Sequence, residues 1–185
     1  MYHGENCIYP VDVIFNLSVV EVVNMSINQN QLRKVMRKWT SGVTVVTATH
    51  NQKKHGMTVS SFTSVSLDPP LVTISLMKDS RTLEMIAGSN SFAITILSGK
   101  QTGISEVFAG KVGDDKDRFN GMETKELITG SPMIVDGIAY FDCKVINILE
   151  FSTNSLIIGE VIAADIGTHD KPLLYFDQQY HQLQE

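Results

Sequence analysis

Hydroxyl side chains gather in one short segment of the chain, residues 56–70. The segment also carries apolar residues, but Ser60-Ser61 and Ser64 interrupt the strict alternation of a strand with one dry face and one wet face. Hydroxyl and backbone groups at such a strand end can be presented to a polar ligand. A barrel strand whose Ser and Thr side chains face water accounts for the pattern equally well. The hydroxyl-bearing residues are Thr58, Ser60, Ser61, Thr63, Ser64 and Ser66.

A second set of polar residues, Ser80-Arg81-Thr82, stands where a helix is expected to begin. A helix start offers free amides and the positive end of the helix dipole, and two hydroxyls and a guanidinium add further donors. These are the groups that bind a phosphate. The alternative is a plain Ser80 N-cap followed by a solvated Arg81.

Together the two segments favour a flavin nucleotide as ligand. The pyrimidine half of a flavin ring exchanges hydrogen bonds along its edge, its other half needs apolar cover, and the nucleotide ends in a phosphate. Other common sites are excluded, because no GxGxxG and no GxSxG motif is present and Gly99-Lys100 is followed by Gln101 instead of the Ser or Thr of a P-loop. The five histidines show no metal-ligand spacing. We therefore expect no metal and no catalytic side chain.

The composition is that of one ordinary globular domain. With 185 residues, 43% of them hydrophobic and 19% charged, the chain can bury a substantial core, and it has no apolar run of the roughly 20 residues that a membrane span needs. A net charge of −5 opposes contact with nucleic acid. Cys7 and Cys143 form no CxxC pattern, which fits a reducing compartment and predicts a cytoplasmic location. Residues 1–24 are interpreted as an N-terminal extension and 25–185 as the domain, although 1–24 could also add an edge strand.

Local patterns predict a mainly β domain with a few short helices. Apolar residues fall on one helix face within 32–39, and a second helix is expected over 80–88. Alternating, β-branched stretches predict strands, and the prolines within 68–70 interrupt pairing because proline lacks an amide donor. At least six strands are expected, and a barrel is the simplest way for them to avoid exposed edges. The expected strands are 43–49, 57–67, 71–76, 92–97, 138–151 and 156–166.

Six blocks of sequence, in order along the chain, carry a resemblance to a known family. They are 39–47, 56–72, 80–82, 92–98, 159–161 and 172–176, the last followed by Tyr180. In this combination the chain resembles the flavin reductase family with the FMN-binding split-barrel fold, from about Leu32 to Leu183. The block at 56–72 is the specific one. The resemblance implies an antiparallel, Greek-key-like split β-barrel.

The resemblance also implies which residues contact a flavin. Phe108, in a Phe-Ala-Gly turn, would cover the cofactor, and His169 would lie near the nicotinamide. Two departures fall on the nicotinamide contacts: Thr153-Asn154 replaces a frequent Asp-His pair, and Gln178-Gln179 replaces a frequent Gly-Arg or Gly-Lys. The residues implied for the flavin ring and ribityl chain are Thr58, Val59, Ser60, Ser61, Ser64, Val65 and Ser66, and those implied for the phosphate are Ser80, Arg81 and Thr82.

By the same resemblance, the protein is expected to be a homodimeric flavin reductase dependent on NAD(P)H. It would pass a hydride from NADH or NADPH to FMN or FAD and supply reduced flavin to a partner monooxygenase. In such an enzyme the cofactors carry the chemistry, which agrees with the lack of an acid/base pair. The alternative is a noncatalytic FMN-binding electron carrier of the same fold. The residues leave open the choice between FMN and FAD and between NADH and NADPH.

Overall fold

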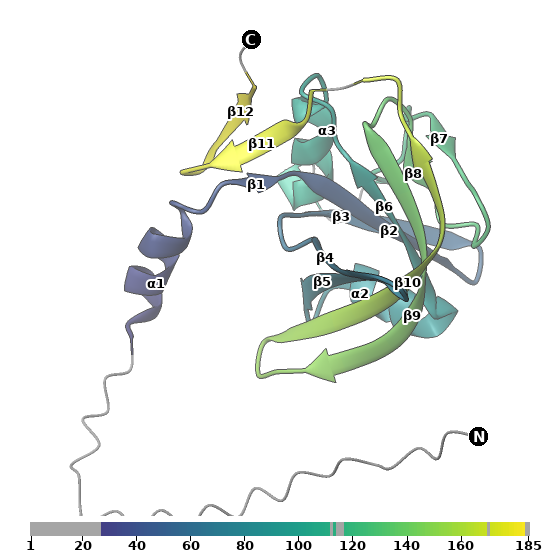
Figure 1. Ribbon diagram of the computed structural model, residues 1–185, viewed down its shortest axis with the longest axis horizontal. Helices are drawn as coiled ribbons and strands as arrows, with labels where there is room; N and C mark the ends of the chain where they lie inside the picture. The colour runs from purple at the N-terminus through teal and green to yellow at the C-terminus, as the bar shows by residue number, and fades with distance from the viewer. Residues whose placement is uncertain (1–26, 112, 114–116, 170, 184–185) are drawn as a thin grey trace, which may run out of the picture.

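The computed structural model describes residues 27–111, 113, 117–169 and 171–183. The proposed N-terminal extension, residues 1–24, lies outside the described residues, and so does Cys7. Strands make up most of the regular structure within these ranges, and the helices are short (Figure 1). The mainly β class predicted from the sequence is thus confirmed. None of the helices in the described ranges is long and apolar enough to cross a membrane.

A seven-stranded antiparallel sheet forms the body of the molecule, in the order β3-β2-β6-β9-β10-β5-β4. Strands β3 and β4 follow each other in the chain with residues 60–62 between them, yet they occupy opposite edges of the sheet. The sheet must therefore curl until its two edges come together (Figure 1). The strands are β2 Thr44–His50, β3 Lys53–Val59, β4 Thr63–Leu67, β5 Pro70–Met77, β6 Ser91–Ile96, β9 Ala139–Glu150 and β10 Asn154–Ile166.

Two smaller sheets and several short helical elements complete the fold. A three-stranded sheet joins β1 to the C-terminal hairpin β11–β12, and a two-stranded sheet joins β7 to β8. The C-terminal hairpin turns at Asp177 and Gln178, which both have positive φ, 46° and 67°. The elements are α1 Gln29–Met36, β1 Ser41–Gly42, α2 Arg81–Ser89, α3 Thr102–Glu106, the π-helical turn η1 Val107–Lys111, β7 Thr124–Lys125, β8 Met133–Ile134, β11 Leu173–Phe176 and β12 Gln179–Gln182.

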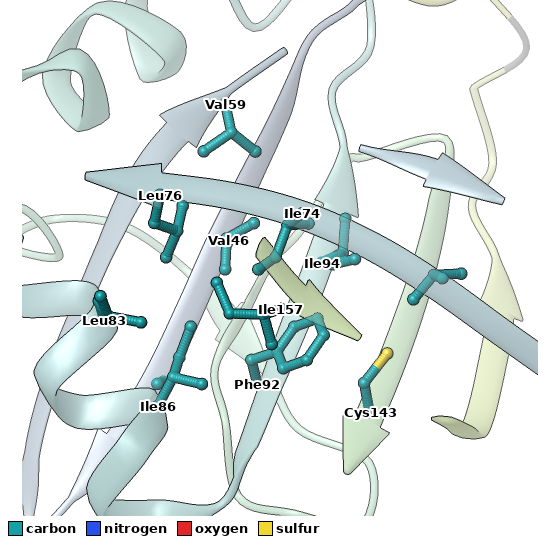
Figure 2. Close-up of a cluster of buried hydrophobic side chains, with 12 residues drawn as sticks. Val46, Val59, Ile74, Leu76, Leu83, Ile86, Phe92, Ile94, Cys143 and Ile157 are labelled. Carbon is teal, nitrogen blue, oxygen red and sulfur yellow. The ribbon is translucent and has the colours of Figure 1, made fainter. Parts of the chain in front are cut away.

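Buried aliphatic side chains fill the inside of the curled sheet (Figure 2). Val46, Ile94 and Ile157, from three different strands, are completely buried. Helix α2 adds Leu83 and Ile86 to this core, as the one-sided apolar pattern of residues 80–88 predicts. Burying a side chain of this size contributes roughly 1.5–3 kcal/mol. The core therefore fixes α2, and with it the helix start at residue 80, against the sheet.

Gly159 is required where β10 passes Phe92. A Cβ at this position would lie 2.5 Å from Cζ of Phe92 and 3.2 Å from Cβ of Cys143. The contact with Phe92 is closer than packed carbon atoms allow, so a larger residue would force the strand and the ring apart. Cys143 is itself buried, and burial raises the pKa of its thiol to about 12. This cysteine is a packing residue at neutral pH.

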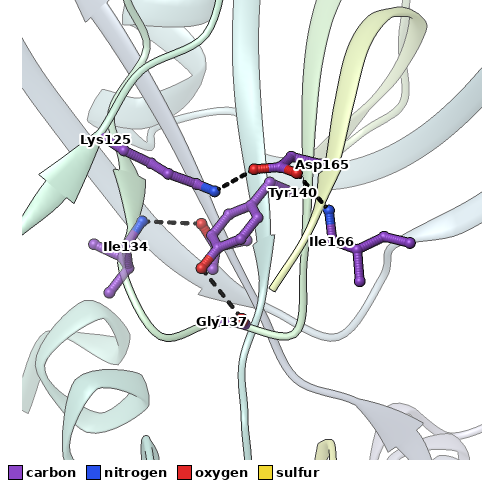
Figure 3. A network of polar contacts seen from close by, with 7 residues as sticks. Lys125, Ile134, Gly137, Tyr140, Asp165 and Ile166 are labelled. Atoms are coloured by element: carbon purple, nitrogen blue, oxygen red, sulfur yellow. Dashed lines mark hydrogen bonds and ion pairs between the residues drawn. The ribbon is translucent and has the colours of Figure 1, made fainter. Parts of the chain in front are cut away.

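A polar network ties β7 and β8 to the main sheet around Tyr140 (Figure 3). The Tyr140 hydroxyl donates to the carbonyl oxygen of Gly137 over 3.1 Å, and Lys125 Nζ lies 3.5 Å from the centre of the tyrosine ring. Lys125 also pairs with Asp165 at 2.7 Å, which lowers the pKa of the Asp165 carboxyl. The polar groups of this region thus make their hydrogen bonds and ion pairs with one another.

Helix α1 forms at the predicted place but ends at Met36, so Trp39, which was expected on the same face, follows the helix, and the apolar face is not covered. Leu32, Val35 and Met36 are 44–59% exposed, and no residue of the helix is buried. The helix projects from the body of the molecule (Figure 1). Two contacts hold its C-terminal end: Lys38 pairs with Asp177 at 2.6 Å, and the Asp177 amide donates to the carbonyl oxygen of Arg37 over 3.0 Å.

Candidate functional site

The end of β3 lines a cavity of about 250 Å³, which we call the ring cavity. Thr58, Val59 and Ser60 form one wall of it. A mixed lining of valine, alanine, tyrosine, hydroxyl and amide groups suits a ligand that is polar along one edge and apolar elsewhere. The remaining residues of the lining are Val43, Ser105, Ala109, Lys111, Tyr175, Gln178 and Tyr180.

Several hydroxyls of the 56–70 segment bind to the protein itself. Thr58 Oγ1 donates to the carbonyl oxygen of Ser105 over 2.7 Å. Ser61 Oγ donates to the carbonyl oxygen of Ser75 over 3.0 Å and accepts from the Ser75 amide over 2.9 Å. These bonds hold the β3–β4 link against β5 and α3. What this wall offers to a ligand is therefore mainly its shape and the exposed side chain of Ser60.

A second cavity of about 570 Å³ adjoins the ring cavity, since Ser60, Tyr175 and Gln178 line both. Its further lining includes Ser61 and the 72% exposed Trp39. Cofactor sites typically occupy about 300–1,000 Å³, and the two adjoining cavities together fall within this range. The space between the end of β3 and the C-terminal hairpin is thus large enough for a flavin ring.

Strand β4 places the other hydroxyls of the segment away from this space. Ser64 and Val65 are exposed, Val65 by 55%, and Ser66 donates to the carbonyl oxygen of Pro69. None of the three lines either cavity. The β4–β5 register shifts between Ser64 and Ser66, which is a β-bulge at Val65. This bulge explains why the sequence alternation breaks here without a ligand.

The helix start at Ser80 forms as the sequence predicts. Ser80 caps α2, accepting from the Leu83 amide over 3.3 Å and donating to the carbonyl oxygen of Met77 over 2.8 Å. Arg81 is exposed and lines a separate, third cavity of about 740 Å³. Thr82 is fully buried, with its hydroxyl 2.9 Å from His55 Nδ1. The Thr82 side chain therefore points into the protein, whereas Ser80 and Arg81 lie at the helix start and their contact with a phosphate stays a prediction.

Phe108 and His169 lie outside the ring cavity. Phe108 is 1% exposed and packs edge to face on Phe119 with ring centres 5.1 Å apart, so that its neighbour Ala109 lines the cavity instead. His169 lines a fourth cavity of about 510 Å³ together with Gln101. The structure brings neither side chain to Thr58–Ser60.

The C-terminal hairpin and the α3–η1 segment supply site residues that sequence reasoning did not assign. Tyr180 Oη lies 2.9 Å from Ser105 Oγ, and the rings of Tyr180 and Tyr175 are 5.4 Å apart. Lys111 lies 2.6 Å from Glu106, and this hydrogen bond raises the pKa of the Lys111 ammonium. Lys111 thus lies at the edge of the ring cavity as the exposed cation of a surface ion pair. The family resemblance of residues 172–176 and Tyr180 included the two tyrosines, but nothing in the sequence pointed to Ser105 or Lys111.

Comparisons with known proteins agree with this architecture. The family model described as flavin reductase like domain matches residues 36–184. The reductase component of an FADH(2)-dependent resorcinol hydroxylase from Rhizobium sp. is 33% identical over 156 residues, which are 83% of this chain and 86% of that protein. The NADH-dependent flavin reductase StyB from Pseudomonas fluorescens is 33% identical over 164 residues, 86% of this chain and 92% of its own.

A solved structure shows the same fold. The flavin reductase PheA2 in its native state superposes with a TM-score of 0.78 at 38% identity, covering 85% of this chain and 99% of its own. The mainly β fold is thus that of a solved flavin reductase, as the sequence predicts. The chain belongs to the flavin reductase like domain family.

Proposed function

We propose that this protein is an NADH-dependent flavin reductase whose flavin ring binds in the ring cavity. The observation that carries the proposal is the cavity itself. The end of β3 forms one of its walls, and Tyr175 and Tyr180 form another. Its lining in the described chain contains no carboxylate or imidazole that could serve as an acid or a base. A flavin bound there would supply the redox chemistry by accepting a hydride from a nicotinamide.

The protein would contribute position and charge to this reaction. Val43 and Val59 offer an apolar surface to a ring, and the Thr58 and Tyr180 hydroxyls keep the opposing walls in place through Ser105. The Lys111 ammonium would favour negative charge at the cavity edge. Holding two reactants in a reactive geometry lowers the barrier without any covalent catalysis by the protein.

The donor and the partner follow from the relatives. The name of the Pseudomonas fluorescens relative supports NADH as the donor. The name of the Rhizobium relative supports a monooxygenase partner that consumes reduced flavin. A cytoplasmic location would make such a donor available, and the free, buried thiol of Cys143 is compatible with that compartment.

A homodimer is also part of the proposal. The apolar face of α1, with Leu32, Val35 and Met36, and the adjacent Trp39 are exposed beside the second cavity. A contiguous exposed apolar surface is typical of an interface, and a second copy of the chain would bury it. Light scattering should report a dimer for the wild type and a monomer for Val35→Glu combined with Met36→Glu. A monomeric wild type would contradict the proposed homodimer.

The activity is tested by mixing the purified protein with NADH and FMN or FAD and following the loss of the NADH absorbance band. We expect strong acceleration over the protein-free mixture. No acceleration with either NADH or NADPH, from a protein that retains flavin after desalting, would instead favour a noncatalytic flavin-binding electron carrier. A protein that neither binds nor reduces flavin would reject both functions.

A further inference from the structure

The overall charge of the chain has the same sign as the charge of its proposed ligands. FMN, FAD and NADH all carry negatively charged phosphate groups. The chain has 15 Lys and Arg residues against 20 Asp and Glu residues, which gives a net charge of −5. A negative protein repels anionic ligands at long range unless cations are concentrated along the path by which the ligands arrive.

Helix α1 and the residues that follow it concentrate such cations. The stretch 27–42 contains Arg33, Lys34, Arg37 and Lys38 and no Asp or Glu. All four cations are exposed. Successive residues of an α-helix are turned by about 100°, so Arg33, Lys34 and Arg37 lie on the side of α1 away from its apolar face. A second copy of the chain on the apolar face would therefore leave these cations accessible.

Two of the cations lie next to the proposed flavin site. Arg33 and Arg37 line the second cavity, which shares three of its lining residues with the ring cavity. The one carboxylate in the described part of this lining, Asp177, is paired with Lys38 at 2.6 Å. The arginines therefore make the second cavity positive. Because they line the cavity itself, salt at physiological ionic strength, with a Debye length of about 8 Å, screens them only in part.

We propose that Arg33 and Arg37 steer anionic nucleotides through the second cavity toward the ring cavity. This role rests on the proposed function and goes beyond it, because it assigns to α1 an effect on the rate at which ligands arrive. Electrostatic steering raises association rates by about 10- to 1,000-fold at low salt. Cations at the rim of a site act mainly on association and on its salt dependence, and little on dissociation. The two arginines thus act before the ligand is bound.

The test compares FMN with riboflavin, which has the same ring and no phosphate, in the wild type and in Arg33→Gln combined with Arg37→Gln. Stopped-flow quenching of flavin fluorescence gives the association and dissociation rates without relying on activity. At about 0.01 M salt, where the Debye length is about 30 Å, FMN should associate roughly 3- to 10-fold more slowly with the variant. Riboflavin should change by less than roughly twofold, and at about 1 M salt the difference for FMN should disappear.

Two further variants separate charge from shape. Lys100→Gln combined with Lys144→Gln is the matched control, because it changes the net charge equally at exposed positions outside both cavities. It should leave FMN association within roughly twofold of the wild-type rate. Arg33→Glu combined with Arg37→Glu reverses the local charge and should slow FMN more than the glutamine variant does.

The proposal makes FMN association depend on the position and the sign of the charge. Equal FMN association rates in the wild type and the glutamine variant at low salt would overturn it, and so would an equal loss in the lysine control or for riboflavin. A loss confined to the dissociation rate would also overturn it, because the arginines would then be contacts of the bound ligand. Failure of the wild type to bind either flavin would instead reject the proposed function.

Discussion

The two halves of the proposed flavin site recognise their ligand by different means. In the ring half, the Thr58 and Ser61 hydroxyls are already bound by Ser105 and Ser75, so the walls are satisfied without a ligand. In the phosphate half, Arg81 is exposed and borders a cleft rich in cations. If a flavin binds as proposed, the ring half would select by shape and the phosphate half by charge.

This difference determines how each half should respond to substitution. In the ring half, added side-chain volume should weaken the binding of every ligand that contains the flavin ring. In the phosphate half, loss of a cation should weaken the binding only of ligands that carry a phosphate. Added salt should weaken that binding as well. Riboflavin and FMN share the ring and differ in the phosphate, so together they separate the two halves.

The largest effect is expected from removing the phosphate contacts. Ser80→Ala combined with Arg81→Ala should weaken FMN binding by about 100-fold or more, because each charge-assisted hydrogen bond contributes roughly 1.5–3 kcal/mol. Riboflavin binding should change by less than roughly twofold. Fluorescence titration measures both. Lys144→Ala, at an exposed position on β9, is the control. An equal loss for both ligands would place the phosphate elsewhere.

The Ser80 substitution also removes an N-cap, so the stability of the variant must be measured beside its affinity. Loss of a Ser cap costs about 1 kcal/mol, which should lower the melting temperature modestly. Arg81→Ala alone keeps the Ser80 cap, so it should lower the melting temperature less than the double variant and still weaken FMN binding. That single variant separates a phosphate contact from a folding defect.

A smaller and different effect is expected from filling the ring cavity. Ser60 lines both adjoining cavities, whereas Ser64 lines neither. Ser60→Phe should weaken FMN and riboflavin equally, by roughly 10- to 100-fold, since forcing extra volume into a packed site costs about 1–3 kcal/mol. Ser64→Phe is the matched control and should leave both affinities unchanged. If Ser64→Phe is the damaging substitution, the ring lies along β4 and the shape comparison fails.

The sequence predicts best the parts of this site that local rules determine. The Ser80 cap and the apolar face of α2 depend on residues within one or two helical turns, and both form as predicted. The broken alternation near Ser64 was a correct signal of irregularity, but its cause is a bulge at Val65. A β-bulge and a strand end that faces a ligand look alike in a sequence, because both interrupt the alternation of apolar and polar residues along the strand.

Long-range contacts explain most of what the sequence did not predict. Tyr180 meets Ser105 across 75 positions of sequence, and the C-terminal hairpin thereby becomes a wall of the ring cavity. No local pattern encodes such a pairing, since it follows from the packing of the whole curled sheet. His169 lines a separate cavity, and the nicotinamide contact that the resemblance implies for it stays a prediction.

The smallest effect concerns the ion pair between Lys38 and Asp177, beside the second cavity. Lys38 hydrogen-bonds Asp177 at 2.6 Å, and this bond lowers the pKa of the Asp177 carboxyl from its ordinary value of 3.8. A carboxyl whose pKa is depressed by folding stabilises the fold above its unfolded pKa and loses that contribution as the pH falls through its folded pKa. The tether of α1 should therefore be constant from neutral pH to about 4 and weaken only below 3.8.

Trp39 reports on this tether, because it is the single tryptophan of the chain and follows Lys38 directly. We expect its fluorescence to change below pH 3.8 in the wild type, whereas Asp177→Asn should show an altered signal that does not depend on pH in this window. The pair is exposed to solvent, so the change should be small and should shrink with added salt. Lys78→Gln breaks a comparable exposed pair, between the turn after β5 and Glu150 at the end of β9, and should leave the Trp39 profile intact. Identical profiles for the wild type and Asp177→Asn would show that the backbone contact between Asp177 and Arg37 holds α1 without help from charge.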